Sequence, residues 1–293
     1  MAAEQNPTVR RRRLGSELRK LREEASKSLE DAAVVLECHR SKISRIELGY
    51  LGIRARDVRD LLDDYGVTDE AVRDHLMALA RDGSKRGWWD KYGQIIQPAY
   101  ANYLDLESDA NYIRTFQSIL IPGLLQTEAY SRAVIQSNPA LVRDEVVDTL
   151  QKVRAERQAI LTRDAEPVRF WSIIGEAALR TPIGGVDVMR AQLDHLTEMV
   201  KRPNITLQVL PYSVGAHAGL SGPFVIFGFN VPGDTGVVFL ENLSSSLYLE
   251  TKEEVDGYTL VFDDLRSSAL NPADSLDYIA KIADELGTKE TKR

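Results

Sequence analysis

The apolar residues between Leu14 and about residue 80 recur at helical intervals in short blocks, and no alternating strand pattern interrupts them. Five short helices are the natural interpretation. Leu14, Leu18 and Leu21 form the inward stripe of the first helix, which is expected to end near Ala25. This pattern predicts an all-α N-terminal domain.

The second expected helix begins with a recognisable cap. Ser28 followed by Asp31 has the spacing of a capping box, and Leu29, Ala32, Ala33 and Leu36 then repeat on one face. Ala32 and Ala33 are small enough for a third helix to cross closely over them. Such close crossing is what a helix-turn-helix requires.

The third expected helix, His39 to Glu47, has two contrasting faces. Ile43 and Ile46 point inward, which leaves outward the residues Arg40, Ser41, Lys42, Ser44 and Arg45. Arginine and lysine donate to guanine edges or phosphates, and serine to phosphates or either kind of base, so this face suits a DNA major groove. From charge alone, an ordinary solvated face is an equal alternative.

Charge is unevenly distributed along the chain, whose net charge is −7. Residues 1–60 contain 14 Lys or Arg against 10 Asp or Glu, a net +4, whereas the remainder contains 23 against 34, a net −11. The basic run Arg10, Arg11, Arg12 and Arg13 is expected to precede the first helix. It could follow the phosphate backbone or enter the minor groove, or it could be a solubilising tail.

The stretch from Leu14 to Tyr65 resembles the XRE (Cro/CI-type repressor) helix-turn-helix, above all in Ser41-Lys42-Ile43-Ser44-Arg45-Ile46-Glu47-Leu48-Gly49. The resemblance implies that this run is the recognition helix with its exit turn, and that operator DNA is the partner. Three positions depart from the family pattern. Glu37 stands at the turn usually held by glycine, His39 at the usual serine cap, and Leu29 at a frequent glutamine. We expect backbone strain at Glu37 and an altered operator contact.

The pattern breaks between Asp82 and Gly87, which predicts a helix-turn-helix domain over 1–82, an aromatic-rich connector over 83–110 and a second domain over 111–288. The aromatic residues that follow the break are Trp88, Trp89, Tyr92, Tyr100, Tyr103 and Tyr112. We favour packing between domains for them over a ligand or nucleic-acid platform, because clustered aromatics chiefly supply buried area.

The second domain is predicted to be mixed α/β. After a helix that starts within Ile121–Tyr130 and a long one from Arg143 to Arg163, expected strands cover 168–174, 205–210, 224–229, 237–241 and 247–250. Expected helices cover 186–201, 252–265 and 274–286. The helix between the first two strands makes a parallel crossover plausible.

A second resemblance covers roughly Tyr112 to Ile279. Its markers, in order, are Ile121–Thr127, Arg154–Gln158, Gly175–Arg180, Gln192-Leu193, Val209–Pro211 and Gly222–Phe224. Together they resemble the C-terminal domain of actinobacterial antitoxin-like XRE regulators. That resemblance implies a small protein partner encoded nearby, and several such regulators act in development or secondary metabolism.

Composition excludes several classes of protein. The single cysteine, Cys38, allows no internal disulfide and no Cys-based metal site, and no apolar run approaches the length of a membrane span. The basic N-terminus lacks the apolar segment of a signal peptide, so we expect a cytoplasmic protein without membrane contact. We expect no cofactor and no metal.

Reacting groups are few, which argues against an enzyme. Glu176, Arg180, His217 and Glu241 are the candidate effector or partner site, although for the glutamates a structural role is favoured. Three functions stay open, in this order: a DNA-binding regulator with a protein partner, one with a small-molecule effector, and an enzyme with an accessory helix-turn-helix. A homodimer on a two-part operator is expected, because a single small helix-turn-helix domain contacts few bases.

Overall fold

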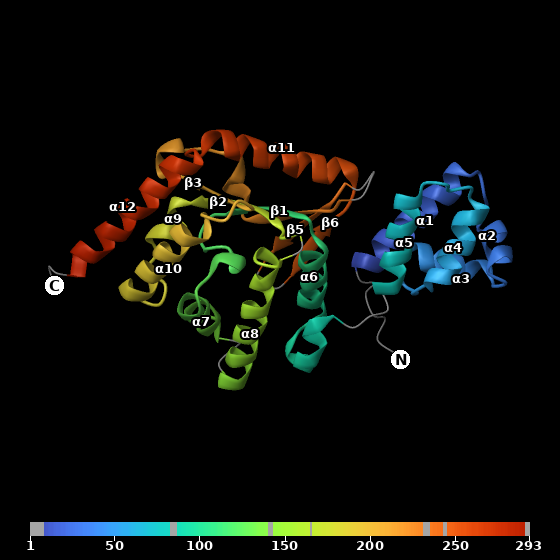
Figure 1. The fold of residues 1–293 in the computed structure, drawn as a ribbon, viewed down its shortest axis with the longest axis horizontal. Coiled ribbons are helices and arrows are strands. Elements are labelled where there is room, and N and C mark those ends of the chain that lie inside the picture. The colour runs from blue at the N-terminus through green and yellow to red at the C-terminus, as the bar shows by residue number, and fades with distance from the viewer. Residues whose placement is uncertain are drawn as a thin grey trace. The chain divides into compact units, whose positions relative to one another are not determined.

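The computed structural model describes residues 9–82, 87–139, 143–164, 166–230, 235–242 and 245–290. The chain divides into two compact units whose boundary falls between Leu106 and Glu107. The first unit is helical and the second contains a mixed sheet with helices, as the sequence predicts (Figure 1). Each unit is described by itself.

Five helices build the core of the first unit, and the prediction of five is confirmed. They are α1 (Val9–Glu24), α2 (Leu29–Val35), α3 (Arg40–Glu47), α4 (Ala55–Asp64) and α5 (Glu70–Asp82). Their apolar stripes meet in one core that includes Leu14, Leu18, Ile43, Ile46, Val58 and Leu76. The predicted capping box at α2 is present: the Ser28 hydroxyl accepts from the Asp31 amide at 3.1 Å, and the Asp31 carboxylate accepts from the Ser28 amide at 2.8 Å.

The expected position of the basic run was wrong. Arg10–Arg13 do not precede the first helix but lie in its opening turns, because α1 already begins at Val9. Arginine is a good helix former, so the helix extends back past the first apolar stripe residue, Leu14. All four arginines are half-buried.

Several of the aromatic residues after the first five helices pair with neighbours that are close in the sequence. In η1 (Trp88–Ile95), Trp88 meets Trp89 and Tyr92 edge-to-face, with centroids 5.5 and 6.4 Å apart. In α6 (Pro98–Asp109), Tyr100 stacks on Tyr103. Tyr112 belongs to a strand of the second unit. Packing between domains stays a prediction, and Gly83–Arg86 of the expected boundary lie outside the described residues.

A six-stranded sheet in the order β3-β2-β1-β4-β5-β6 forms the second unit. Its strands are β1 (Tyr112–Gln117), β2 (Arg169–Gly175), β3 (Ile205–Leu210), β4 (Phe224–Gly228), β5 (Val237–Glu241) and β6 (Ser246–Leu249). β1, β2 and β3 are parallel, as expected for the crossover from β2 to β3, whereas β4, β5 and β6 continue the sheet antiparallel. The sequence predicted five of these strands and missed β1.

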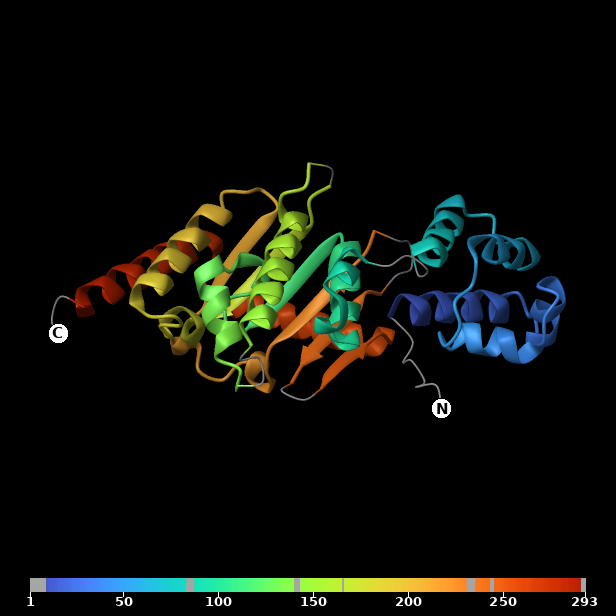
Figure 2. The same ribbon diagram turned by 90° about the horizontal axis from the view of Figure 1, so that it is seen from below.

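Helices cover both faces of the sheet (Figures 1 and 2). α11 (Lys252–Ser268) lies on one face, where Val255, Phe262 and Leu265 pack against sheet residues such as Phe116 and Ile226. On the other side lie α7 (Glu128–Gln136), α8 (Asp144–Arg157) and α10 (Val186–Met199). α12 (Pro272–Glu290) packs beside β3 and α10. The expected long helix over 143–163 is α8 followed by the 3₁₀ turn η4 (Gln158–Leu161).

Three of the sequence markers of the second domain meet at η2 (Gly123–Leu125), the turn after β1. The Gln192 side chain donates to the Leu125 carbonyl at 2.7 Å and accepts from the Thr127 amide at 2.6 Å. Gln158 donates to the Gln126 carbonyl at 2.7 Å, and Arg154 donates to the Gln126 side chain at 2.7 Å. In this chain the three markers thus meet at one turn, where the Gln192 and Gln158 side chains satisfy backbone groups and Arg154 holds the Gln126 side chain.

We expect Gln192→Leu to lower the free energy of unfolding by about 2 to 4 kcal/mol, because it strands the buried Leu125 carbonyl and the Thr127 amide. Urea unfolding of the full chain measures this. Gln136→Leu, on the exposed end of α7, is the matched control and should be close to neutral. Equal effects of the two substitutions would contradict a structural role for the turn.

Candidate nucleic-acid interface

α2 and α3 form a helix-turn-helix whose turn contains the two departures noted in the sequence. Glu37 has a φ of 47°, the left-handed conformation that usually selects glycine, so the expected strain is present. His39 replaces the usual serine as the N-cap of α3, and its Nδ1 accepts from the Ser41 amide at 3.2 Å. The cap is therefore retained with a different acceptor, and the start of α3 is not left unsatisfied.

The predicted reading face of α3 is open to solvent. Ile43 and Ile46 are buried in the core, whereas Arg40, Ser41, Lys42 and Arg45 are exposed and Ser44 is half-buried. Arg40 forms an exposed ion pair with Glu30 of α2 at 2.9 Å, and the hydrogen bond from Arg40 lowers the pKa of Glu30. An exposed pair of this kind is weak, so a phosphate can replace it.

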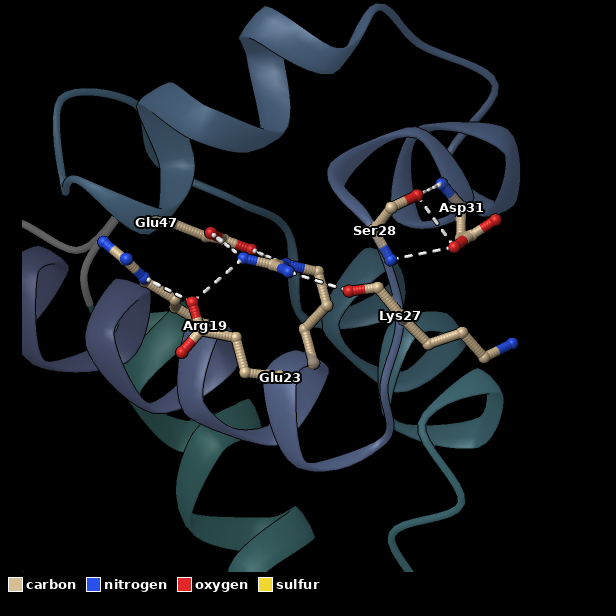
Figure 3. A network of polar contacts seen from close by, with 7 residues as sticks. Arg19, Glu23, Lys27, Ser28, Asp31 and Glu47 are labelled. Atoms are coloured by element: carbon tan, nitrogen blue, oxygen red, sulfur yellow. Dashed lines mark hydrogen bonds and ion pairs between the residues drawn. The ribbon is translucent and has the colours of Figure 1, made fainter.

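A buried ion pair holds α3 on α1. Arg22 donates from Nε to Glu47 Oε1 at 2.7 Å and from Nη2 to Oε2 at 3.0 Å, and both side chains are less than a tenth exposed. Arg22 Nη1 also donates to the Lys27 carbonyl in the turn before α2, at 2.8 Å. Figure 3 shows Glu47 and Lys27 at the two ends of this network. One guanidinium thus ties α1, the turn and the end of the reading helix together.

The electrostatics of this site favour the charged form of Arg22. Hydrogen bonding to Glu47 raises the pKa of Arg22, although burial acts in the opposite direction. Beside it, burial raises the pKa of the Tyr65 hydroxyl, with a smaller contribution from the Glu47 carboxylate. Gly15 on α1 makes the close approach possible, because a Cβ there would lie 2.4 Å from the Ile46 and Glu47 carbonyl oxygens.

The basic run lies against the end of this motif. A Cβ on Gly49, which follows α3, would lie 2.9 Å from the Arg12 amide nitrogen, and one on Gly52 would contact the Arg11 guanidinium. Arg10 pairs with Asp105 at 2.6 Å within the first unit. Arg10 is therefore engaged within the protein, which argues against the tail interpretation for that residue.

Two further basic residues escaped the sequence interpretation. Arg54 is the N-cap of α4 without a side-chain cap hydrogen bond, and Arg56 stands in the first turn with its side chain 81% exposed. Cations at the positive end of a helix dipole are unfavourable, although Asp57 in the same turn lies 3.8 Å from Arg56 and offsets part of their charge. The sequence feature that could have identified them is a pair of basic residues at the start of α4, the helix that follows α3.

The four candidate residues of the second domain do not form one site. Glu176 and Arg180 of α9 (Glu176–Arg180) pair at 2.5 Å, Arg180 also pairs with Glu285 at 2.8 Å, and Glu176 accepts from the Tyr212 amide at 2.9 Å. Burial opposes ionisation of Glu176, but these hydrogen bonds prevail and lower its pKa. The pair therefore connects α9 to α12 and to the loop after β3.

His217 lies in the loop between β3 and β4, and Glu241 lies at the end of β5. His217 caps η6 (Ala218–Ser221) by accepting from the Gly219 amide at 3.1 Å, and its ring lies edge-on to Phe116 at 5.8 Å. Glu241 is exposed at the end of β5, three strand positions away from β2. In the described part of the chain, no group of three or more His, Cys, Asp or Glu side chains is placed to hold a metal ion. No described helix is both long and apolar enough to cross a membrane.

The comparisons with known proteins match the N-terminal and C-terminal parts of the chain to two different domain families. Residues 13–76 match the family model described as a helix-turn-helix domain, which defines the chain as a DNA-binding regulator of the helix-turn-helix class. Residues 100–281 match the model described as a domain of unknown function, DUF5753, and the chain belongs to this family. No curated protein and no solved structure matches the chain.

We expect Arg22→Met to lower the free energy of unfolding by about 3 to 5 kcal/mol, because it leaves the Glu47 carboxylate buried without its cation. The double variant Arg22→Met/Glu47→Leu should recover most of that loss, since an apolar pair of similar size needs no charge compensation. Urea unfolding compares them, with Arg19→Met, from the exposed pair with Glu23, as the near-neutral control. A double variant no more stable than Arg22→Met would show that the carboxylate is not the cause.

Proposed function

We propose that this protein is an XRE-type, antitoxin-like transcriptional regulator that binds operator DNA through α3 as a homodimer. The observation that carries the proposal is the reading face of α3, where Arg40, Ser41, Lys42 and Arg45 are exposed on a helix fixed to the core by Ile43, Ile46 and Glu47. Base readout in a major groove requires a helix that is held in place and presents cationic side chains to the bases. Arg54 and Arg56 add phosphate contacts beside it.

The second unit, in this proposal, receives the signal from a small protein partner. Its support is the resemblance to antitoxin-like regulators together with the chemistry of the candidate residues. Glu176 and Arg180 hold neighbouring elements together, and His217 caps a turn, which are structural tasks. We therefore propose a binding domain without catalytic activity. Control by a small-molecule effector is the second candidate, and thermal stabilisation by a metabolite would favour it.

We expect Arg45→Ala to weaken binding to the cognate operator by about 1 to 3 kcal/mol if Arg45 donates to a guanine. The operator is first obtained by sequencing DNA captured by the purified protein, and affinities are then measured at one fixed salt concentration. Arg132→Ala, an exposed arginine of α7, is the control for lost positive charge. Operator affinity that is unchanged in Arg40→Ala and Arg45→Ala, with folding intact, would contradict the assignment of α3.

We expect the partner to bind with different affinity in the presence and absence of operator. A partner changes DNA occupancy only if it distinguishes the DNA-competent state from the other, and linkage then requires DNA to change partner affinity by the same factor. Calorimetric titration of the small co-purifying protein, with and without operator, measures both. If the partner bound equally well with and without operator, this coupling would be absent. Recruitment or sequestration would then be the remaining explanation of the partner's role.

A further inference from the structure

A cavity in the first unit has no role in the proposed function. It has a volume of about 230 Å³ and lies between α1, the end of α3, α5 and the loop that connects α3 to α4. All of its lining residues belong to the first unit. Gly52 of the loop and Ala80 of α5 line the cavity, and both are too small to fill it.

The wall of the cavity is aliphatic. Four of its lining side chains are aliphatic and less than a tenth exposed, namely Leu14, Ile46, Ile53 and Leu79. No aromatic residue is among the described residues that line it. A cavity with such a wall offers water no hydrogen-bond partners, but it binds hydrocarbon of matching size. The wall therefore suits an alkyl group.

The charges at the cavity are positive. Among the described residues that line it, the ionisable ones are Arg11 and Arg54. A Cβ at Gly52 would lie 3.7 Å from Arg11 Nε, so this guanidinium lies beside the loop that ends at Arg54. Arg54 is exposed, and within the described residues it takes part in no ion pair and no capping hydrogen bond. Because a guanidinium matches the planar oxygens of a carboxylate, these residues favour that anion.

The wall, the charge and the volume together define one class of ligand. A DNA phosphate matches the arginines but has no hydrocarbon for the wall, and a neutral alkyl compound leaves the arginines without an anion. An apolar cavity of about 150 Å³ holds benzene, with its six carbons, so one of about 230 Å³ holds roughly nine. An aliphatic carboxylate of about eight carbons meets all three conditions.

We propose that this cavity binds a small aliphatic carboxylate, with its alkyl tail against Ile46 and Leu79 and its oxygens at Arg11 and Arg54. The ligand lowers operator affinity, because it competes for Arg54 with the DNA phosphate that the proposed function places there. Only this effect on DNA rests on the proposed function. The binding of the carboxylate does not.

Octanoate is the test compound, and equilibrium dialysis of the labelled acid against the full chain measures its affinity without DNA. We expect octanoate to occupy a single site per chain. Hexanoate should bind roughly fifteenfold more weakly, because each methylene lost from the apolar wall costs roughly fourfold in affinity. Octylammonium, which has the same tail with the opposite charge, should not compete with octanoate.

Two substitutions test the two parts of the site. Arg54→Gln should weaken octanoate binding at least about tenfold, because it removes a charged hydrogen-bond donor. Arg59→Gln is the matched control: this exposed arginine of α4 does not line the cavity, so octanoate affinity should be unchanged. Gly52→Leu fills the edge of the cavity beside Arg11 and should also weaken binding at least about tenfold.

The Gly52 variant is expected to fold, because Gly52 has no positive φ and a Cβ there makes only ordinary contacts. Circular dichroism and urea unfolding verify this for every variant. The proposal is overturned if octanoate does not bind the wild-type chain, if Arg54→Gln and Gly52→Leu leave its affinity unchanged, or if octylammonium competes equally well.

Operator affinity is measured separately, with and without saturating octanoate at one ionic strength. A loss of affinity in the wild-type chain is the expected result, and Gly52→Leu should be insensitive to octanoate. An operator affinity that octanoate leaves unchanged overturns the competition at Arg54. Since the dialysis contains no DNA, failure of the carboxylate site and failure of the proposed function are distinguishable.

Discussion

The ion pair between Arg22 and Glu47 is the interaction on which the reading head depends. Its two hydrogen bonds and the third one to the Lys27 carbonyl join three segments that are distant in sequence, and burial excludes water that would weaken them. Such a pair adds little net stability compared with apolar residues, but its two parallel hydrogen bonds are directional. Here that geometry sets the position of α3 relative to α1.

Several neighbouring residues allow α3 to lie close to α1 and α2. Gly15 removes the side chain that would collide with the end of α3, and Ala32 and Ala33 let α3 cross close to α2. The turn between α2 and α3 accepts the left-handed conformation of Glu37, a non-glycine residue. Local strain at one residue is sustained because packing on both sides of the turn determines its path.

How far the sequence predicted the structure varied with the range of the interactions. The five helices, the capping box and the faces of α3 were predictable, since they depend on periodicity and on residues within a few positions of each other. The cap supplied by His39 was not predictable, because it depends on side-chain geometry. The partner of Glu47 was not predictable either, because Arg22 is 25 positions away in the sequence. β1 was missed although its burial alternates, since Arg114 and the neighbouring aromatics obscured the pattern. The start of α1 at Val9 was not predictable from the apolar stripe, which begins at Leu14, because helix propensity carries the arginine run into the helix.

The rigidity of the reading head restricts how a signal can act. Because Glu47 is bonded to α1 and Ile43 and Ile46 are buried, moving α3 would break these contacts with the core of the first unit. In the proposed function, a signal received by the second unit would therefore leave the reading face of α3 intact. It would act instead on the number of helix-turn-helix domains available or on their separation, and a two-part operator depends on both.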